Sequence, residues 1–184
     1  MIRVLETEHL LLKPLGVFDI DALQQVFPKW EIVRWLDATV PWPYPADGAR
    51  YFVENVVLPQ IESGTGWHWS IRRRAEPAIL IGEITLQEVE HRNRGFWIVP
   101  EWQRHGFATE AAEAVTRFWF EDLGKSVLQV PKAAANLASR RISERQGMRV
   151  IKHFKGQLVG GEYDFELWEL SRDDWLERRE GKGG

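Results

Sequence analysis

The sequence predicts one α/β domain, in which a central mixed but mostly antiparallel sheet of about seven strands is flanked by helices. Three observations lead to this prediction. Strand-like and helix-like patterns alternate along the whole chain, its 184 residues suit one well-buried domain, and no repeat, linker or low-complexity segment divides it. We therefore assign residues 1–180 to one domain and expect residues 181–184, three of which are glycine, to form a flexible tail.

The first third of the chain predicts one strand and two helices. Residues 10–15 form a short apolar strand. In residues 18–27 the apolar side chains fall on one helical face, and the proline that follows ends this helix. Residues 46–61 also have helical spacing, and we expect Pro59 to kink this second helix or end it early. The intervening segment, 28–45, is mostly irregular.

The middle of the chain predicts three strands. Residues 67–72 alternate strictly, so the two tryptophans of this run share one face with Ile71. A turn at Glu76-Pro77 leads to a second strand at 79–87. After a polar connection, residues 94–99 form the third strand.

The last part of the chain predicts three helices and three strands. Residues 108–123 have helical spacing, with Gly124 as the stop. Asn136 is a good N-cap for a helix that runs to about residue 146, and Ser171 opens a capping box for a short terminal helix. The strands between these helices are expected at 126–130, 148–154 and 163–170, the last two antiparallel across a glycine-containing connection.

The composition excludes several classes of function. The chain has no cysteine, which rules out disulfides, thiolate zinc sites and a cysteine nucleophile, and which fits a cytoplasmic location. The net charge of -3 argues against nucleic-acid binding. No apolar run is long enough to span a bilayer, and no signal-peptide pattern opens the chain, so we expect no membrane partner. No His/Asp/Glu cluster has the spacing of a metal site, so we expect no metal.

The most informative stretch is Gln103-Arg104-His105-Gly106-Phe107-Ala108, which lies between a predicted strand and a predicted helix. The first N–H groups of a helix lack intrahelical partners, and the helix dipole favours negative charge there. A glycine-bearing turn that opens a helix is therefore an anion site, and it points to a phosphate-bearing cofactor. A dinucleotide-binding fold would need Gly-x-Gly-x-x-Gly after the first strand, and a Walker loop would need Gly-Lys-Ser/Thr; neither occurs.

The chain is rich in tryptophan, with ten residues of this type. Each of them can serve a core or a ligand pocket, because tryptophan combines a large apolar body with one N–H donor. The proline-punctuated stretch Pro41-Trp42-Pro43-Tyr44-Pro45 is too stiff for a regular core element and could wall a pocket. The residues expected to line a substrate pocket are Trp35, Trp42, Tyr44, Trp69 and Glu83.

The order of elements, the turn at 103–108 and the helix start Asn136-Leu137-Ala138-Ser139 resemble the GNAT superfamily of acyl-CoA N-acyltransferases. The family turn is Gln/Arg-x-x-Gly-x-Gly/Ala, and its three defined positions match here. The stretch 95–111 and Gly161-Glu162-Tyr163 are similar to the branch that acetylates the N-terminal alanine or serine of ribosomal proteins. The resemblance extends from residue 10 to residue 170.

The resemblance implies acetyl-CoA as the cofactor. The amides of the turn would cradle its pyrophosphate, and the strand at 97–99 would pair with the pantetheine arm, with a backbone N–H of Ile98 or Val99 facing the thioester carbonyl. Asn136 would hydrogen-bond the arm, and Ser139 would lie near the sulfur; the alternatives are a plain helix cap and an ordinary surface serine. The implied cofactor residues are Trp97, Ile98, Val99, Gln103, Arg104, His105, Gly106, Phe107, Ala108, Thr109, Asn136 and Ser139.

The general base is the point at which this sequence departs from the family. Many members carry a Glu at a position that falls at Asn93 here, and an amide cannot accept a proton at neutral pH. Glu83 is the first substitute, the alternative being a solvent-facing glutamate. His68 and His105 could act through water, and a chain of waters could also take the proton. We thus name Ser139 and Glu83 as the catalytic candidates.

Two functions from different classes agree with these residues. The first is an N-acetyltransferase that joins acetyl-CoA to a primary amine, either a protein N-terminus or a small molecule, by direct attack in a ternary complex. The second is a non-catalytic acyl-CoA-binding sensor or assembly module that has lost its base. A homodimer is compatible with both.

Overall fold

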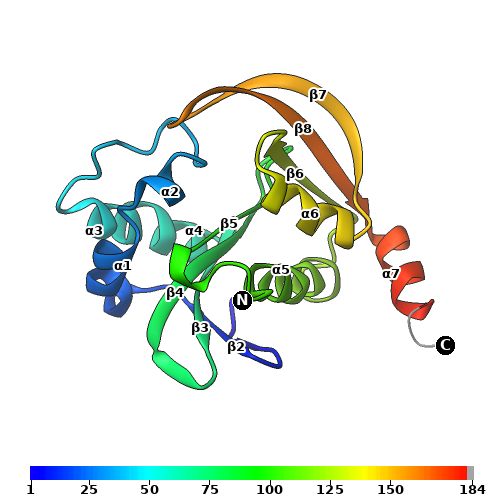
Figure 1. Ribbon diagram of the computed structural model, residues 1–184. Helices are drawn as coiled ribbons and strands as arrows, with labels where there is room; N and C mark the ends of the chain where they lie inside the picture. Colours follow the sequence, from blue (N-terminus) through cyan, green and yellow to red (C-terminus); the bar gives the residue numbers. More distant parts are fainter. Residues whose placement is uncertain (182–184) are drawn as a thin grey trace.

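The computed structural model describes residues 1–181 and contains two antiparallel sheets with helices packed around them (Figure 1). Every pairing between its named strands is antiparallel. The first sheet has the order β1-β2-β3-β4-β5, with β1 Leu5–Glu6, β2 Leu10–Pro14, β3 Gly66–Arg73, β4 Glu76–Gln87 and β5 Arg94–Ile98. The second has the order β6-β8-β7, with β6 Val127–Ala133, β7 Arg149–Leu158 and β8 Gly161–Ser171.

The mixed α/β class is confirmed, and the single sheet of about seven strands becomes two sheets of five and three. The sequence pattern missed the two-residue strand β1, and it placed the β3–β4 turn at Glu76-Pro77, whereas the turn occupies 74–75. Gly181 follows the last helix as a turn residue, and the rest of the expected tail, 182–184, lies outside the described residues.

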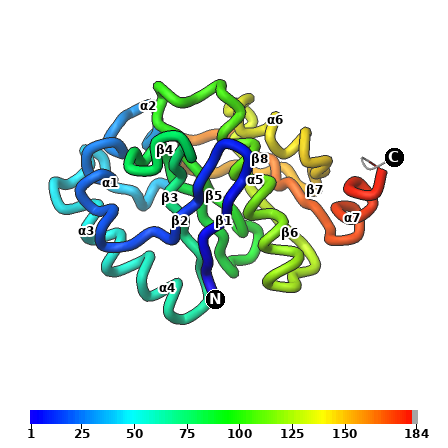
Figure 2. The backbone as a smooth tube through the Cα atoms, turned by 90° about the horizontal axis from the view of Figure 1, so that it is seen from below, coloured from blue at the N-terminus to red at the C-terminus, as the bar shows by residue number. Residues whose placement is uncertain are grey.

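The helical segments group on both sides of the first sheet (Figure 2). Before β3 they are η1 Val17–Asp19, α1 Ile20–Val26, α2 Trp30–Val33, α3 Gly48–Phe52, η2 Val53–Val57 and α4 Leu58–Ser63. After β5 they are η3 Pro100–Trp102, α5 Phe107–Arg117, η4 Phe118–Asp122, α6 Leu137–Arg145 and α7 Arg172–Glu180.

Pro59 does not end its helix. The segments α3, η2 and α4 form one run that continues to Ser63, with Pro59 in the first turn of α4. The turn η2 before it is of the π type, and the Leu58 N–H donates to the carbonyl of Val53. A wider turn absorbs the missing N–H and the bulk of a proline ring, so the helix passes through it.

The core lies on the two faces of the first sheet. One cluster joins β2, β3 and β4 to α5 and η4, and a second joins β4 and β5 to α1, α3 and η2. Trp69 is fully buried in the first cluster, where its ring meets Phe118 edge-on at 5.2 Å. The other face of β3 carries His68. This face lies on the side of the sheet where the second cluster packs.

The two sheets meet at one point and then separate. The backbone N–H of Asn93 donates to the carbonyl of Gln129 at 2.8 Å, and the Gln129 N–H donates to Asn93 Oδ1 at 2.7 Å. Beyond this contact β5 and β6 form the two walls of a cavity. The Asn93 side chain also donates to the carbonyl of Val89 at 3.0 Å. Asn93 therefore links the two sheets at the point where they meet.

Candidate functional site

The turn between β5 and α5 presents a row of backbone N–H groups to the cavity. Arg104 and Gly106 have φ of 64° and 85°, in the left-handed region. Within residues 1–181, no protein group accepts a hydrogen bond from the N–H groups of 104–109. Left-handed residues in alternation with ordinary ones at the start of a helix form an anion-binding nest. The conformation of Arg104 carries strain that the sequence did not reveal.

Two side chains hold this turn in place. Gln103 Nε2 donates to the carbonyl of Ile98 at 2.9 Å, which ties the turn to the end of β5. The His105 ring stacks against Phe107 at 5.6 Å and lies outside the cavity lining. The Gln103 side chain is therefore a latch for the turn, although it also borders the cavity, and His105 contributes its N–H rather than its ring.

Two backbone N–H groups at the end of β5, those of Ile98 and Val99, were the candidates to face the thioester carbonyl, and only one of them points into the gap. The Val99 N–H already donates to the carbonyl of Ile81 at 2.9 Å, so it is not free to face a thioester carbonyl. Along an antiparallel strand successive N–H groups point to opposite sides, so the Ile98 N–H points away from β4, into the gap. The β4–β5 register runs without a shift.

The start of α6 supplies polar groups on the opposite wall. Asn136 caps this helix by accepting the Ser139 N–H at 3.2 Å, as the sequence predicted. The amide nitrogen of Asn136 stays available to the cavity, and the half-buried Ser139 also lines it. The cavity lining also includes Arg104 in the turn, Arg141 and Arg145 on α6, and Lys152 on β7.

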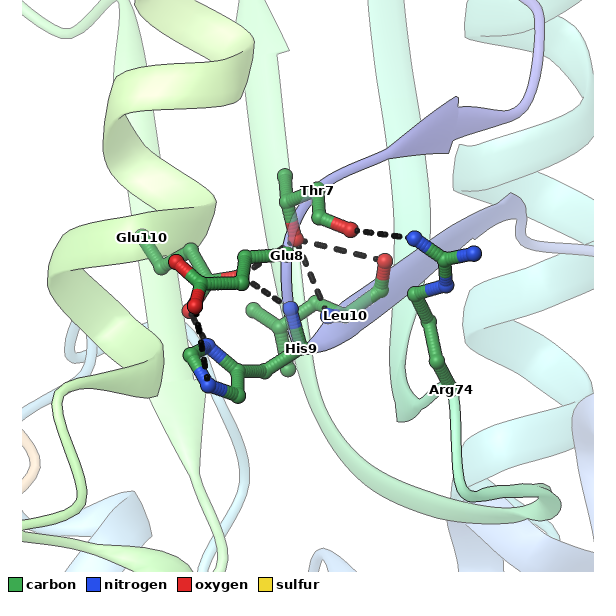
Figure 3. Close-up of polar contacts among 6 residues, drawn as sticks. All are labelled: Thr7, Glu8, His9, Leu10, Arg74 and Glu110. Carbon is green, nitrogen blue, oxygen red and sulfur yellow. Dashed lines mark hydrogen bonds and ion pairs between the residues drawn. The ribbon is translucent and has the colours of Figure 1, made fainter.

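Glu110, in the first turn of α5, holds this helix against the first sheet through hydrogen bonds (Figure 3). Glu110 Oε1 accepts from the Thr7 hydroxyl at 2.5 Å and from the His9 N–H at 2.8 Å, and His9 Nδ1 lies 3.0 Å from Oε2. Burial opposes ionisation of this carboxyl, but these hydrogen bonds prevail and lower its pKa. The β1–β2 turn thus fixes the helix whose first N–H groups form the nest.

The cavity has a volume of about 1640 Å³ and continues through the gap between β5 and β6 to the far side of the sheet. On that side Glu83 and His68 are 6% and 3% exposed. Glu83 Oε1 lies 3.0 Å from His68 Nδ1, and Glu83 Oε2 accepts from Trp97 Nε1 at 3.0 Å. Glu83 is buried, as the sequence predicted, and it pairs with Ser70 on β3 and with Trp97 on β5.

His68 is held from both ends. Its Nε2 lies 2.8 Å from Gln60 Oε1 on α4, and its Nδ1 faces Glu83. With the Gln60 amide in this orientation, both ring nitrogens donate only when His68 is an imidazolium. Rotation of that amide lets a neutral His68 donate to Glu83 and accept from Gln60. Either state supplies Glu83 with a donor and leaves its remaining lone pairs for a ligand.

Tyr44 forms part of the cavity wall near Glu83. Its ring meets Phe27 edge-on at 4.7 Å, and Phe27 in turn meets Trp97 at 5.3 Å. Burial and the nearby negative charge of Glu83 raise the pKa of Tyr44 to about 12. The phenol therefore remains neutral and lines the cavity, as the sequence predicted.

Two of the expected pocket tryptophans lie elsewhere. Trp69 Nε1 donates to the carbonyl of Arg3 at 2.8 Å, and its fully buried ring belongs to the core. Alternation showed which residues of β3 share a face but not which face meets the cavity, and that face carries His68. Trp42 is 42% exposed and packs on Trp30 at 5.5 Å, outside the cavity lining. Trp35 does line the cavity and packs on Tyr163 at 5.4 Å.

The segment that follows α2 reaches the tip of the β7–β8 hairpin (Figure 1), and several of its residues line the cavity. Asp37 forms an antiparallel bridge with Leu158, and the Val159 N–H donates to the carbonyl of Leu36 at 3.0 Å. Arg92 also contacts Asp37 at 3.1 Å. Two distant parts of the chain thus enclose the end of the cavity that holds Glu83.

Sequence reasoning missed Gln60 and Lys132, both of which line the cavity. Nothing in the helical pattern around Gln60 distinguishes it. Lys132 had a signal, because it shares an alternating face with the core residues Leu128 and Val130. A charged side chain at a core position of a strand is an anomaly that requires a reason.

In the part of the chain that the structure describes, no helix is long and apolar enough to cross a membrane. Nor do residues 1–181 contain a group of three or more His, Cys, Asp or Glu side chains able to hold a metal ion.

Comparison with known proteins agrees with this geometry. The YoaA protein of Bacillus subtilis (strain 168), described as an uncharacterized N-acetyltransferase, is 26% identical over 182 residues, which cover 92% of this chain and 97% of YoaA. The ribosomal-protein-S5-alanine acetyltransferase from Vibrio fischeri superposes with a TM-score of 0.80 at 15% identity, over 95% of this chain and 99% of that one.

A second solved structure contains the cofactor. RimL, described as a ribosomal L7/L12 alpha-N-protein acetyltransferase and solved in complex with coenzyme A, superposes with a TM-score of 0.79 at 17% identity. It covers 94% of this chain and 99% of its own. The sequence model of the acetyltransferase (GNAT) domain matches residues 9–149. The chain therefore belongs to the GNAT acetyltransferase family.

Proposed function

We propose that this protein transfers the acetyl group of acetyl-CoA to a primary amine by direct attack within a ternary complex. The observation that carries the proposal is one continuous cavity with two chemically different ends. One end has the N–H nest and a cluster of cations. The other has the buried carboxylate of Glu83, and the gap between β5 and β6 connects them.

The residues at the first end fit coenzyme A. Its phosphates match the N–H groups of 104–109 and the surrounding arginines, since anions bind at such nests and cations steer them there. Its pantetheine arm carries amides, for which the Asn136 side chain is a partner.

The acyl donor, when bound, supplies a thioester carbonyl and a thiolate leaving group. Glu83 accepts the proton that the attacking amine loses, and its hydrogen bonds to His68 and Trp97 fix its orientation. The Ile98 N–H donates to the carbonyl oxygen as negative charge develops there. The Ser139 hydroxyl donates to the departing sulfur. The N–C bond forms as the C–S bond breaks, and this needs no covalent enzyme intermediate.

The acceptor end is suited to a cationic amine. Besides Glu83, its lining includes the carboxylates of Glu31, Asp37, Asp47 and Glu90. These attract the amine in its ammonium form, which loses one proton to solvent before attack; the second proton, released as the N–C bond forms, goes to Glu83. RimL is named an alpha-N-protein acetyltransferase, and the Vibrio fischeri protein is named a ribosomal-protein-S5-alanine acetyltransferase. We propose a protein N-terminus or a small primary amine as the acceptor here.

One observation favours a second function. Asn93 occupies the usual position of the base, and its side chain is fully engaged in joining β5 to β6. A protein that keeps the cofactor cavity without a working base would be an acyl-CoA sensor.

Release of free thiol from acetyl-CoA separates the two functions. The assay mixes the protein with acetyl-CoA and a panel of amines, including short peptides that begin with alanine or serine. Calorimetry measures CoA affinity in parallel. The enzyme predicts tight CoA binding with thiol release for at least one amine. Binding without any release supports the sensor, and a lack of CoA binding contradicts both.

A further inference from the structure

Lys132 places an ammonium group in the gap between the two sheets. It lies near the end of β6 and is 5% exposed. Its Nζ is 4.8 Å from the centroid of the Phe96 ring on β5, so the side chain spans from one wall of the gap to the other. Both residues line the cavity, and Phe96 directly precedes Trp97, whose Nε1 binds Glu83.

This ammonium has no polar partner among the described residues. Glu166 is its register neighbour on β8, but that carboxylate binds Arg140 at 2.8 and 3.1 Å and Trp168 Nε1 at 3.1 Å. The charged group that acts on it is Arg94, which has the same sign. A contact with the Phe96 ring attracts the charge but satisfies none of its three N–H donors.

Such an arrangement is unfavourable in the protein alone. A buried charge without hydrogen bonds is destabilising, and burial followed by repulsion from Arg94 lowers the pKa of Lys132 well below its ordinary value. Arg94 at least has acceptors, because Thr116 Oγ1 and Gln146 Oε1 each lie 2.7 Å from its Nη1. Lys132 borders the cavity instead, so its acceptor has to come from there.

The position of the group indicates the kind of acceptor. Phosphates belong at the nest and its surrounding arginines, and the amine belongs beside Glu83. What crosses the gap is the uncharged arm between them, whose polar acceptors are carbonyl oxygens. We propose that the Lys132 ammonium donates a hydrogen bond to a carbonyl oxygen of the pantetheine arm of the acyl donor. This inference rests on the proposed function, and it makes Lys132 a positioning residue for the donor.

The test compares three ligands by calorimetry, namely CoA, 4′-phosphopantetheine and 3′,5′-ADP, the last of which lacks the arm. In Lys132→Met, we expect the first two to bind about tenfold more weakly, and 3′,5′-ADP to change by less than about twofold. Arg145→Met at the basic end is the matched control, and it should weaken CoA and 3′,5′-ADP in parallel. Lys132→Gln serves as a second variant of the same site.

The possible results distinguish a failure of the Lys132 inference from a failure of the proposed function. Unchanged affinity of both Lys132 variants for CoA and 4′-phosphopantetheine would overturn the inference while leaving the proposed function in place. Equal losses for all three ligands would also overturn it, since they would indicate a general effect on the cavity. If the unmodified protein bound none of the three, the proposed function would fail first.

Discussion

Buried charge at single residues distinguishes this cavity from an ordinary pocket. Glu83 is buried with two donors, His68 and Trp97. Lys132 is buried with none in the described residues and with Arg94 nearby. Charged side chains are almost never fully buried unless they are paired, so an unpaired one indicates a ligand or a cost in stability. For Lys132 both consequences can be measured.

We expect Lys132→Met to stabilise the protein in the absence of ligand by about 1 to 3 kcal/mol at pH 7, because it removes a charged group from a side chain that is only 5% exposed and has no hydrogen bond to residues 1–181. The lowered pKa of Lys132 means that the unfolded chain binds more protons than the folded one as the pH rises toward 10.5. The stability of the unmodified protein therefore increases relative to that of the variant over this range. Urea unfolding at several pH values measures the difference, and a constant difference would contradict the burial argument. Arg94 is present in both the unmodified protein and the variant, so the two proteins differ only at residue 132.

At the scale of elements, the turn between β5 and α5 and the first turn of α5 together form the anion-binding nest. The nest depends on left-handed backbone at Arg104 and Gly106, and the helix depends on the clasp that Glu110 makes with Thr7 and His9. Backbone geometry and helix anchoring can be tested separately, because each has a substitution that leaves the other intact.

Gly106→Ala tests the nest. An added Cβ meets no protein atom within 4 Å, but alanine is strained at φ of 85°. Gly124 is the matched control, since it has φ of 65°, equally open surroundings and no place in the cavity lining. Both variants should lose about 1 kcal/mol of stability. Only Gly106→Ala should also weaken CoA, by about tenfold, as measured by calorimetry. A similar CoA affinity in the two variants would remove the pyrophosphate from this turn.

Glu110→Gln tests the clasp. At pH 7 we expect it to lower the free energy of unfolding by about 1 to 2 kcal/mol, because it weakens hydrogen bonds to a carboxylate. The pKa of Glu110 is lowered from 4.5, so its contribution is complete above pH 4.5 and is lost as the pH falls through the folded-state pKa. Denaturant melts from pH 7 downward should show the two proteins converging below pH 4.5. A gap that persists in acid would contradict this.

At the scale of the whole molecule, the function depends on two sheets that meet at Asn93 and Gln129 and then diverge. Local sequence patterns predicted the turn, the Asn136 cap and the buried Glu83, because each depends on nearby residues. They did not predict the division into two sheets, the burial of Trp69 or the position of Lys132 across from Phe96. Those depend on which face of a strand meets the core, and that is decided by contacts between distant segments.

The central claim is that Glu83 takes the proton from an amine that attacks a donor held at the other end of the same cavity. The most direct test is the rate of thiol release from acetyl-CoA by Glu83→Gln, with Glu101→Gln as a control at an exposed carboxylate outside the cavity. We predict that Glu83→Gln lowers kcat by about 100-fold or more, keeps its affinity for CoA, and that the control matches the unmodified protein. Full activity in Glu83→Gln would contradict the account.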